Sequence, residues 1–562
     1  MIMRGVIVAA ITVIASGVID RTPAEAQQPQ PGTIAKQFED KAKERARGKS
    51  AAPTLPDFSS QAANANKAPA FVLKGVSVNG ATAIPREEIA RVYRSLLGRP
   101  VSQADLLKIS DGITALYRQK GYALSRAFIP AQDVKEGRVQ IRVVEGHIDE
   151  VAFEGADGGL YGADQLLAAV KAERPLRLAT LERGLLVVSD TPGIAIKDTM
   201  LKEVGQASGR FRLTLLLEAW RHSVSVEVDN RGTADIGPLQ SFISGAAHSA
   251  LIKGDVWALN VMTIPDTPEE LAYLGGLAEF PLGRNGHRFG VKGYFSELRP
   301  DGIRRLFDTR INTTELGVYI GSKPIRTSER SLDLVLSAGL RHAEEKDTGG
   351  TLYDDRIQFV TFSADYQVND HYNGTNYLVF GGRLGYGEPG SEWSDLSRFD
   401  AEGEFYKLFW TAARNQRITE RWSLLLSTSG QWTSSSLLQS EQFYIGGPLL
   451  GRAFSSGELA GDSGVADLLE IRFDSAEMMG PIRGYQLYGF IDAGIVWNNG
   501  SPIQESLSSY GAGIRVALQD EYRAGFEIAL PLDYHSFANQ DDGTRFYFSL
   551  SKTFRGCPLC GR

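Results

Sequence analysis

The chain has no long hydrophobic run. None of its 562 residues lies in a stretch of ~20 consecutive apolar residues, the length that a transmembrane helix needs. The chain also has no basic excess, because its 60 Lys and Arg residues are outnumbered by 67 Asp and Glu residues. Without that excess, general binding to nucleic acid is disfavoured, and we expect no nucleic-acid partner.

Cysteine and histidine are scarce and poorly placed for chemistry. The two cysteines, Cys557 and Cys560, form a single Cys-Pro-Leu-Cys motif. A redox site wants a βα context and a zinc site wants two further ligands, and neither is present. The motif therefore favours a small disulfide loop or a reduced tail. The seven histidines are scattered singly, so we expect no metal site.

Signatures of enzymes are incomplete. Gly461-Asp-Ser-Gly464 is part of the nucleophile string of trypsin-like proteases, but Val465 stands where that string has glycine. Residues 385–390 match GxGxxG, yet no helix follows to receive a pyrophosphate. A lipase-type Gly-x-Ser-x-Gly is absent. These observations predict a protein that is not an enzyme and uses no cofactor.

The first 70 residues indicate export and a flexible connection. Arg4, an apolar run over 6–18 and Ala24-Glu25-Ala26 predict a signal peptide over 1–26. Residues 27–70 are poor in large apolar residues, and within them 33–49 has good helix formers and mixed charges. The composition alone predicts a solvated helix over 33–49 followed by a linker.

The next 150 residues predict two compact units with the same element order. Each has a strand, two helices and two strands, an order written βααββ, and the units cover 71–146 and 147–220. Pro85 and Ser102 mark helix starts in the first unit. The predicted elements are strand 72–78, helices 85–97 and 103–119, strands 122–129 and 138–145, then strand 148–154, helices 162–172 and 179–190, and strands 194–204 and 210–219.

From residue 221 the texture changes to polar and apolar residues in alternation. The blocks recur roughly every 20 residues, as a ~10-residue membrane strand with its turn requires. In 521–530 the even-numbered side chains are apolar, whereas the odd set holds Arg523 and Glu527. In 464–474 the charged Glu470 likewise lies on the face opposite the apolar residues, and we expect such charges on the inner wall. This pattern predicts a 16-stranded transmembrane antiparallel β-barrel over 221–554, followed by a tail over 555–562. The predicted strands start near 222, 239, 255, 270, 287, 312, 330, 356, 376, 402, 421, 464, 484, 506, 521 and 543.

A glycine-rich loop between two predicted strands carries the most specific pattern. Residues 443–464 contain Arg452 near Phe454, and the strand over 487–497 places Asp492 opposite an apolar face. If that face meets lipid, Asp492 points into the lumen, where an unpaired charge is costly. We therefore predict a bidentate pair between Arg452 and Asp492, which holds the loop inside the barrel.

These residues resemble the barrel-plugging loop of the Omp85 superfamily. That loop has the signature Val-Arg-Gly-Tyr/Phe, and the chain reads Gly451-Arg-Ala-Phe454. Its partner strand reads Phe-x-Asp-x-Gly, matched here by Phe490, Asp492 and Gly494. The resemblance extends to the TpsB branch, the two-partner secretion transporters. It implies two periplasmic POTRA domains (71–146 and 147–220) and a plug helix over 33–49 inside the pore.

The resemblance implies an outer-membrane translocator that captures an unfolded exoprotein in the periplasm and secretes it through the barrel. The implied partners are a large β-helical exoprotein of the adhesin or haemolysin type and outer-membrane lipid. Two alternatives stay open, a barrel-assembly factor and a passive porin-like channel. Free strand edges bind extended chains, although such an edge is also compatible with plain surface. The expected partner-binding edge consists of Ala123, Leu124, Ser125, Arg126, Ala127, Phe128 and Ile129.

Overall fold

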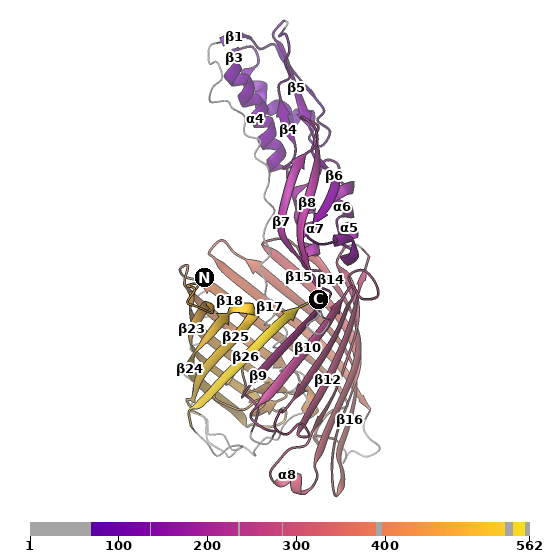
Figure 1. Cartoon of the computed structure of the whole chain (residues 1–562), viewed down its shortest axis with the longest axis vertical. Coiled ribbons are helices and arrows are strands. Elements are labelled where there is room, and N and C mark those ends of the chain that lie inside the picture. The colour runs from indigo at the N-terminus through magenta and orange to yellow at the C-terminus, as the bar shows by residue number, and fades with distance from the viewer. Residues whose placement is uncertain are drawn as a thin grey trace.

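The structure is a computed structural model of the chain, and its three parts follow one another along the long axis (Figure 1). Two α+β units precede a β-barrel, and the second unit lies between the first unit and the barrel. In the part of the chain described, no helix is long and apolar enough to cross a membrane. The predicted signal peptide, plug helix and Cys-x-x-Cys motif lie outside the described residues. The described residues are 69–134, 136–233, 236–283, 285–388, 396–533 and 543–556.

The first unit packs its helices on a three-stranded sheet of order β2-β5-β4. It consists of β1 (Pro69–Val72), β2 (Gly75–Asn79), α3 (Arg86–Tyr93), the 3₁₀ turn η2 (Arg94–Leu96), β3 (Pro100–Ser102), α4 (Gln103–Gln119), β4 (Arg126–Phe128) and β5 (Arg138–Val144). A capping box starts α4, in which the Ser102 hydroxyl accepts from the Asp105 N–H and the Asp105 carboxylate accepts from the Ser102 N–H. The buried face of α4, which includes Ile113 and Tyr117, joins the core of the unit.

Two predictions for the first unit differ in outcome. The predicted helix over 103–119 is confirmed, because α4 has these bounds and begins after Ser102, the residue predicted to start it. The strand predicted over 122–129 is shorter, since only β4 is extended there. Gly121 adopts a left-handed φ of 88°, and the Ser125 N–H donates to the Tyr122 carbonyl, so a turn replaces the first half of the predicted strand.

The second unit repeats the sheet of the first with the order β6-β8-β7. It consists of β6 (His147–Glu154), the 3₁₀ turn η3 (Gly158–Tyr161), α5 (Ala163–Leu166), α6 (Ala168–Ala172), α7 (Leu178–Ser189), β7 (Ile194–Glu203) and β8 (Arg210–Ala219). In each sheet one edge strand, β2 or β6, is parallel to the central strand. The other edge strand, β4 or β7, is antiparallel to it. The helix predicted over 162–172 is divided at Leu167 into α5 and α6.

The barrel is closed, because β9 pairs with both β10 and β26. Every neighbouring pair is antiparallel, and sixteen strands complete the circle. The strands are β9 (His222–Asp229), β10 (Gln240–His248), β11 (Val256–Thr263), β12 (Leu271–Leu282), β13 (His287–Leu298), β14 (Arg310–Arg326), β15 (Arg330–Asp347), β16 (Gly350–Asn369), β17 (Gly374–Glu388), β18 (Glu404–Arg417), β19 (Trp422–Trp432), β22 (Ser463–Ser475), β23 (Ile482–Trp497), β24 (Gln504–Leu518), β25 (Tyr522–Pro531) and β26 (Arg545–Arg555). The short helix α8 (Ile303–Leu306) lies at the far end of the barrel (Figure 1), and the 3₁₀ turn η6 (Gln519–Glu521) precedes β25.

The predicted barrel is confirmed in strand number and in the direction of its side chains. On β14 the apolar Leu316 and Ile320 are more than half exposed on the outside, whereas Glu315 is 6% exposed and faces inward. Predicted strand starts lie within two residues of the observed ones except for β16, which begins at Gly350 rather than at 356. The extra residues, which include Asp354 and Asp355, are too polar to show the alternation of a membrane strand.

The second unit is fixed to the end of the barrel at which the chain enters. Asp190, at the end of α7, accepts hydrogen bonds from Arg326 at 2.8 Å and Lys323 at 3.0 Å, both near the end of β14. The two α+β units are joined by an ion pair of 2.7 Å between Arg126 and Glu203. These contacts place the units in line above the barrel opening (Figure 1).

Candidate functional site

The segment between β19 and β22, residues 433–462, folds into the barrel and is called the lumen loop below. It contains the 3₁₀ turn η5 (Gln439–Glu441) and a hairpin formed by β20 (Phe443–Ile445) and β21 (Leu459–Gly461). Its charged side chains pair with inward-facing residues of β15, β17 and β18 and of β22, β23 and β25. Contacts with these separate parts of the inner wall place the loop in the lumen.

Arg452 is the cation that the loop inserts into an acidic part of the wall. The residue is 4% exposed. Its Nη1 atom lies 2.8 Å from Glu470 and 3.3 Å from Glu527, and its Nε atom lies 3.9 Å from Asp492. The guanidinium also lies 4.2 Å from the centre of the Phe490 ring, a cation–π distance. The Tyr488 ring lies farther away, at 6.0 Å, so three carboxylates and two aromatic rings surround this buried cation.

Asp492 binds the backbone of the loop more closely than it binds the guanidinium. Its Oδ1 atom accepts a hydrogen bond of 2.9 Å from the Gly451 N–H and another from the Ser509 hydroxyl. The structure therefore lacks the bidentate pair predicted between Arg452 and Asp492. The hydrogen bonds of the Arg452 guanidinium go to Glu470 and Glu527 instead, and the nearest Asp492 oxygen, Oδ2, lies 3.9 Å from Nε, beyond hydrogen-bond distance.

The other predicted loop residues pack the loop against the wall. Phe454 and Phe490 are 3% and 6% exposed and belong to one apolar cluster with Ile445 and Leu459. Gly494 faces this cluster, and a Cβ atom there would lie 3.1 Å from the Ile445 side chain. The glycine therefore leaves room for the loop hairpin to approach β23.

Two residues of the site were not connected with it from the sequence. The alternation of β22 and β25 places Glu470 and Glu527 on the inner wall, as the sequence indicates. Their contact with Arg452 depends on which inward positions of neighbouring strands lie at the same height. That height follows from the strand register, which one sequence does not specify.

The predicted partner-binding edge, residues 123–129, is only partly a strand edge. Leu124 and Ser125 are 3% and 0% exposed and belong to the turn before β4. On β4 itself, the Ala127 N–H donates to the Thr114 hydroxyl of α4 at 2.9 Å. In the described residues no strand pairs with the outer side of β4, but its central N–H is already used. In contrast, β7 presents ten residues at the edge of the second sheet.

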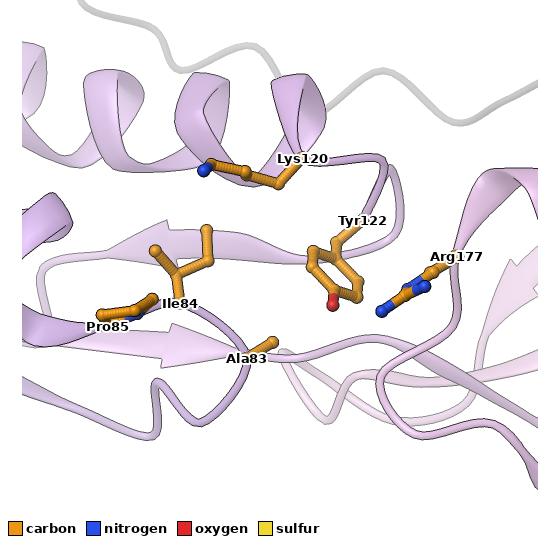
Figure 2. A pocket seen from close by; sticks show the side chains of 6 residues that line it. All are labelled: Ala83, Ile84, Pro85, Lys120, Tyr122 and Arg177. Atoms are coloured by element: carbon orange, nitrogen blue, oxygen red, sulfur yellow. The ribbon is translucent and has the colours of Figure 1, made fainter.

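A shallow pocket of about 250 Å³ lies where the two α+β units meet (Figure 2). Figure 2 shows Lys120 and Arg177 on either side of the Tyr122 ring, with Ile84 and Pro85 forming the apolar side. Both cations have partners, because Lys120 pairs with Glu88 at 2.7 Å and Arg177 lies 5.8 Å from the centre of the Tyr122 ring. The cation–π contact between Arg177 of the second unit and Tyr122 of the first therefore joins the two units at this pocket.

One group among the described residues has side chains of metal-binding type close together. The ligand atoms of His342, Glu344 and Asp354 lie within 4.8 Å of one another. Asp354 already pairs with His342 at 2.8 Å and with Arg356 at 2.9 Å. Glu344 pairs with Lys346 at 2.7 Å, so both carboxylates of the group already have a cationic partner.

Family comparisons match two parts of the chain. Residues 71–146 match the model described as POTRA domain, ShlB-type. Residues 349–516 match the model described as haemolysin secretion/activation protein ShlB/FhaC/HecB. The first match covers the first α+β unit, and the second runs from β16 into β24 and includes the whole lumen loop.

Relatives with curated functions span most of the chain. The heme/hemopexin transporter protein HuxB of Haemophilus influenzae is 22% identical over 484 residues, which cover 83% of this chain and 84% of HuxB. The outer membrane transporter CdiB of Escherichia coli is 23% identical over 518 residues, which cover 88% of this chain and 85% of CdiB.

Solved structures share the fold. CdiB from Escherichia coli superposes with a TM-score of 0.73 at 18% identity, over 94% of this chain and 100% of CdiB. CdiB from Acinetobacter baumannii superposes with a TM-score of 0.63 at 15% identity, over 93% of this chain and 97% of that protein.

Proposed function

We propose that this chain, which belongs to the ShlB/FhaC/HecB family of haemolysin secretion/activation proteins, is the outer-membrane transporter of a two-partner secretion system. The family is a TpsB branch of the Omp85 superfamily. The barrel spans the outer membrane, and the POTRA domain lies in the periplasm. The chain would capture one exoprotein in the periplasm and pass it through the barrel to the cell surface.

The observation that carries this proposal is the lumen loop. Arg452 is held at 2.8 Å by Glu470 inside a closed sixteen-stranded barrel, and that barrel follows a POTRA domain. A passive pore has no need of an internal loop held by buried charges, which are costly unless they are paired. A transporter needs such an element, because a wide conduit must stay closed to other solutes.

Capture of the exoprotein would use the α+β units. The second unit, residues 147–220, has the strand arrangement of the first, and we propose that it is a second POTRA domain. An extended exoprotein segment would add to a free edge, at β4 within the predicted residues 123–129 or at β7. We also propose that residues 33–49 plug the resting pore and that residues 1–26 direct export.

The exported partner would be a large β-helical protein of the adhesin or haemolysin type. An unfolded chain fits a barrel lumen, and a chain that folds outside cannot diffuse back through it. Folding at the cell surface would thus give the transport its direction without a nucleotide, which the periplasm does not supply. In this proposal the chain has no enzymatic activity and contacts outer-membrane lipid with the apolar side chains outside the barrel.

A deletion of this chain in its native strain tests the function. The culture supernatant and the outer-membrane proteins are compared with those of the parent strain by quantitative mass spectrometry. Loss of one large protein from the supernatant, with the membrane proteins unchanged and restoration by a plasmid copy, is the expected result. Loss of many barrels from the membrane would favour an assembly factor, and no change in either fraction would favour a passive channel.

A further inference from the structure

A second buried charge of the lumen loop, Glu441, lies near the start of the loop and outside the set of loop-holding residues predicted from the sequence. The Glu441 carboxylate is 0% exposed. It is paired with Lys407 at 2.7 Å, Arg341 at 2.8 Å and Arg383 at 2.9 Å. Lys407 also donates to the Glu441 backbone carbonyl at 2.7 Å. Three side chains therefore hold one residue of η5, and Lys407 contacts both its carboxylate and its backbone.

This cluster lies on a different part of the wall from the Arg452 cluster. The three cations around Glu441 belong to β15, β17 and β18, whereas the carboxylates around Arg452 belong to β22, β23 and β25. The loop leaves the wall after β19 and returns at β22. In the closed strand order, the two clusters thus lie on either side of the point at which the loop leaves the wall.

The root of the loop at Glu441 and its tip at Arg452 carry opposite charges, and each lies against wall residues of the opposite charge. Glu441 is an anion among three cations, and Arg452 is a cation among three carboxylates. Neither residue fits the other cluster, because like charges would then be buried together. The pair of clusters therefore specifies which part of the wall the root of the loop contacts and which part its tip contacts.

Further contacts hold the root of the loop, near Glu441, against the wall. The Gln431 amide donates to the backbone carbonyls of Glu441 and Asp462 at 3.0 Å each, so it ties the outgoing arm to the returning arm. Leu437 and Leu438 are 0% and 2% exposed and pack against β16 and β18. The first part of the loop is thus buried as fully as its tip.

We propose that Glu441 is a second anchor of the lumen loop, a positioning residue that fixes residues 437–441 to the wall at β15, β17 and β18 independently of Arg452. The inference rests on the proposed function, in which the loop fills the conduit. It deepens that function, because the loop can then leave the barrel lumen only when two separate sets of ion pairs break. The tip and the root of the loop are expected to respond to different substitutions.

Thiol labelling of the purified full-length chain tests the second anchor. Cys557 and Cys560 are replaced by Ser, and a single reporter is introduced as Ser440→Cys at the root or Ala453→Cys at the tip. Ser440 is 7% exposed and its hydroxyl has no hydrogen-bond partner, and Ala453 is 2% exposed, so both reporters start buried. The rate of reaction with a small charged methanethiosulfonate reagent then measures how often each part leaves the wall.

Glu441→Gln is expected to raise the labelling rate at position 440 by at least about tenfold and the rate at position 453 by less than about twofold. Arg452→Met is expected to give the reverse pattern, and Glu441→Asp is expected to restore most of the protection. The matched control is Asp333→Asn, which removes a wall carboxylate paired with Arg288 at 2.9 Å and not with the loop. Equal labelling at position 440 in Glu441→Gln and in this control would overturn the proposal.

A second variant covers failure of Glu441→Gln to fold. Lys407→Gln leaves Glu441 with both arginines, and a smaller rise of the rate at position 440 is expected. No rise there would also overturn the proposal. Secretion is measured separately in the native strain, so that the secretion function and the anchor at Glu441 are tested independently of each other. An unaltered supernatant after deletion of the chain would remove the secretion function and leave the labelling result standing.

Discussion

Arg452 on the lumen loop and Glu470 on β22 lie 2.8 Å apart, and Glu470 is shared with two further arginines. Arg472 lies 2.6 Å and Arg515 3.0 Å from the same carboxylate. One buried carboxylate therefore contacts a cation from the loop and one cation each from β22 and β24. This makes Glu470 the centre of the loop's anchor, a position that Asp492 has in the sequence-based prediction.

The first prediction ranks the carboxylates around Arg452. Glu470→Gln leaves three arginines with less negative charge and is expected to destabilise the bound loop by about 3–5 kcal/mol. Asp492→Asn keeps an oxygen that accepts from the Gly451 N–H and is expected to cost less. Hydrogen exchange of residues 446–456, followed by mass spectrometry, measures the difference. Faster exchange in Asp492→Asn than in Glu470→Gln would contradict the ranking.

The second prediction concerns a charge exchange between Arg452 and Asp492. The double variant Arg452→Asp with Asp492→Arg places a carboxylate beside Glu470 and Glu527, so repulsion replaces attraction. Secretion lost in each single variant is therefore expected to stay lost in the double variant. The amount of exoprotein in the culture supernatant measures this, with membrane levels of each variant as the control. Restored secretion would indicate that Arg452 and Asp492 act as an isolated pair.

Alternation along the strands made the barrel predictable, because a lipid-facing side chain and a lumen-facing one follow each other at a period of two. Glu470 and Glu527 were placed on the inner wall by this rule alone. The cation of the loop anchor, Arg452, could be predicted from the sequence, because it lies in a glycine-rich loop. The carboxylates of the anchor could not be predicted, because the contact of Arg452 with β22 and β25 follows from the register of the whole barrel.

Local competition explains the error at β4. Alternation predicts a strand over 122–129, but Gly121 and the turn at Ser125 direct the chain toward α4. The Thr114 hydroxyl of α4 then accepts a hydrogen bond from the Ala127 N–H. The sequence alone does not indicate that these two residues are in contact. The Glu441 cluster was missed for a related reason, since its three cations are spread over β15, β17 and β18.

The third prediction concerns the edge that receives the exoprotein. A photo-crosslinking residue at Met200, 46% exposed on β7, is expected to attach more exoprotein than one at Phe128 on β4. The reason is that β7 offers ten residues, whereas the central N–H of β4 is used. Leu124, 3% exposed, is the buried control position. Stronger crosslinking at Phe128 would favour the edge predicted from the sequence.

The fourth prediction concerns the attachment of the second unit to the barrel. Burial by itself raises the pKa of Asp190, but the hydrogen bond from Arg326 and the charges of Arg326 and Lys323 outweigh it and lower the pKa below the usual aspartate range. Because the attached state has the lowered pKa, its stabilisation is complete above the ordinary aspartate pKa. It is lost as the pH falls through the lowered value.

Asp190→Asn is therefore expected to weaken the attachment by about 1.5–3 kcal/mol at neutral pH, the range for hydrogen bonds to charged groups. In the unaltered chain, the protection of residues 323–328 against hydrogen exchange, relative to the intrinsic exchange rate at each pH, is expected to fall on acidification below the ordinary aspartate pKa. In Asp190→Asn this protection is already lower at neutral pH and is expected to change little with acid. The control is Asp149→Asn, because Asp149 pairs with Arg210 inside the second unit and makes no contact with the β14 end in the described structure. If the two variants show the same pH dependence, another group controls the attachment, and Glu182 of α7, whose carboxylate accepts a hydrogen bond from the Ser328 N–H, is then the next to replace.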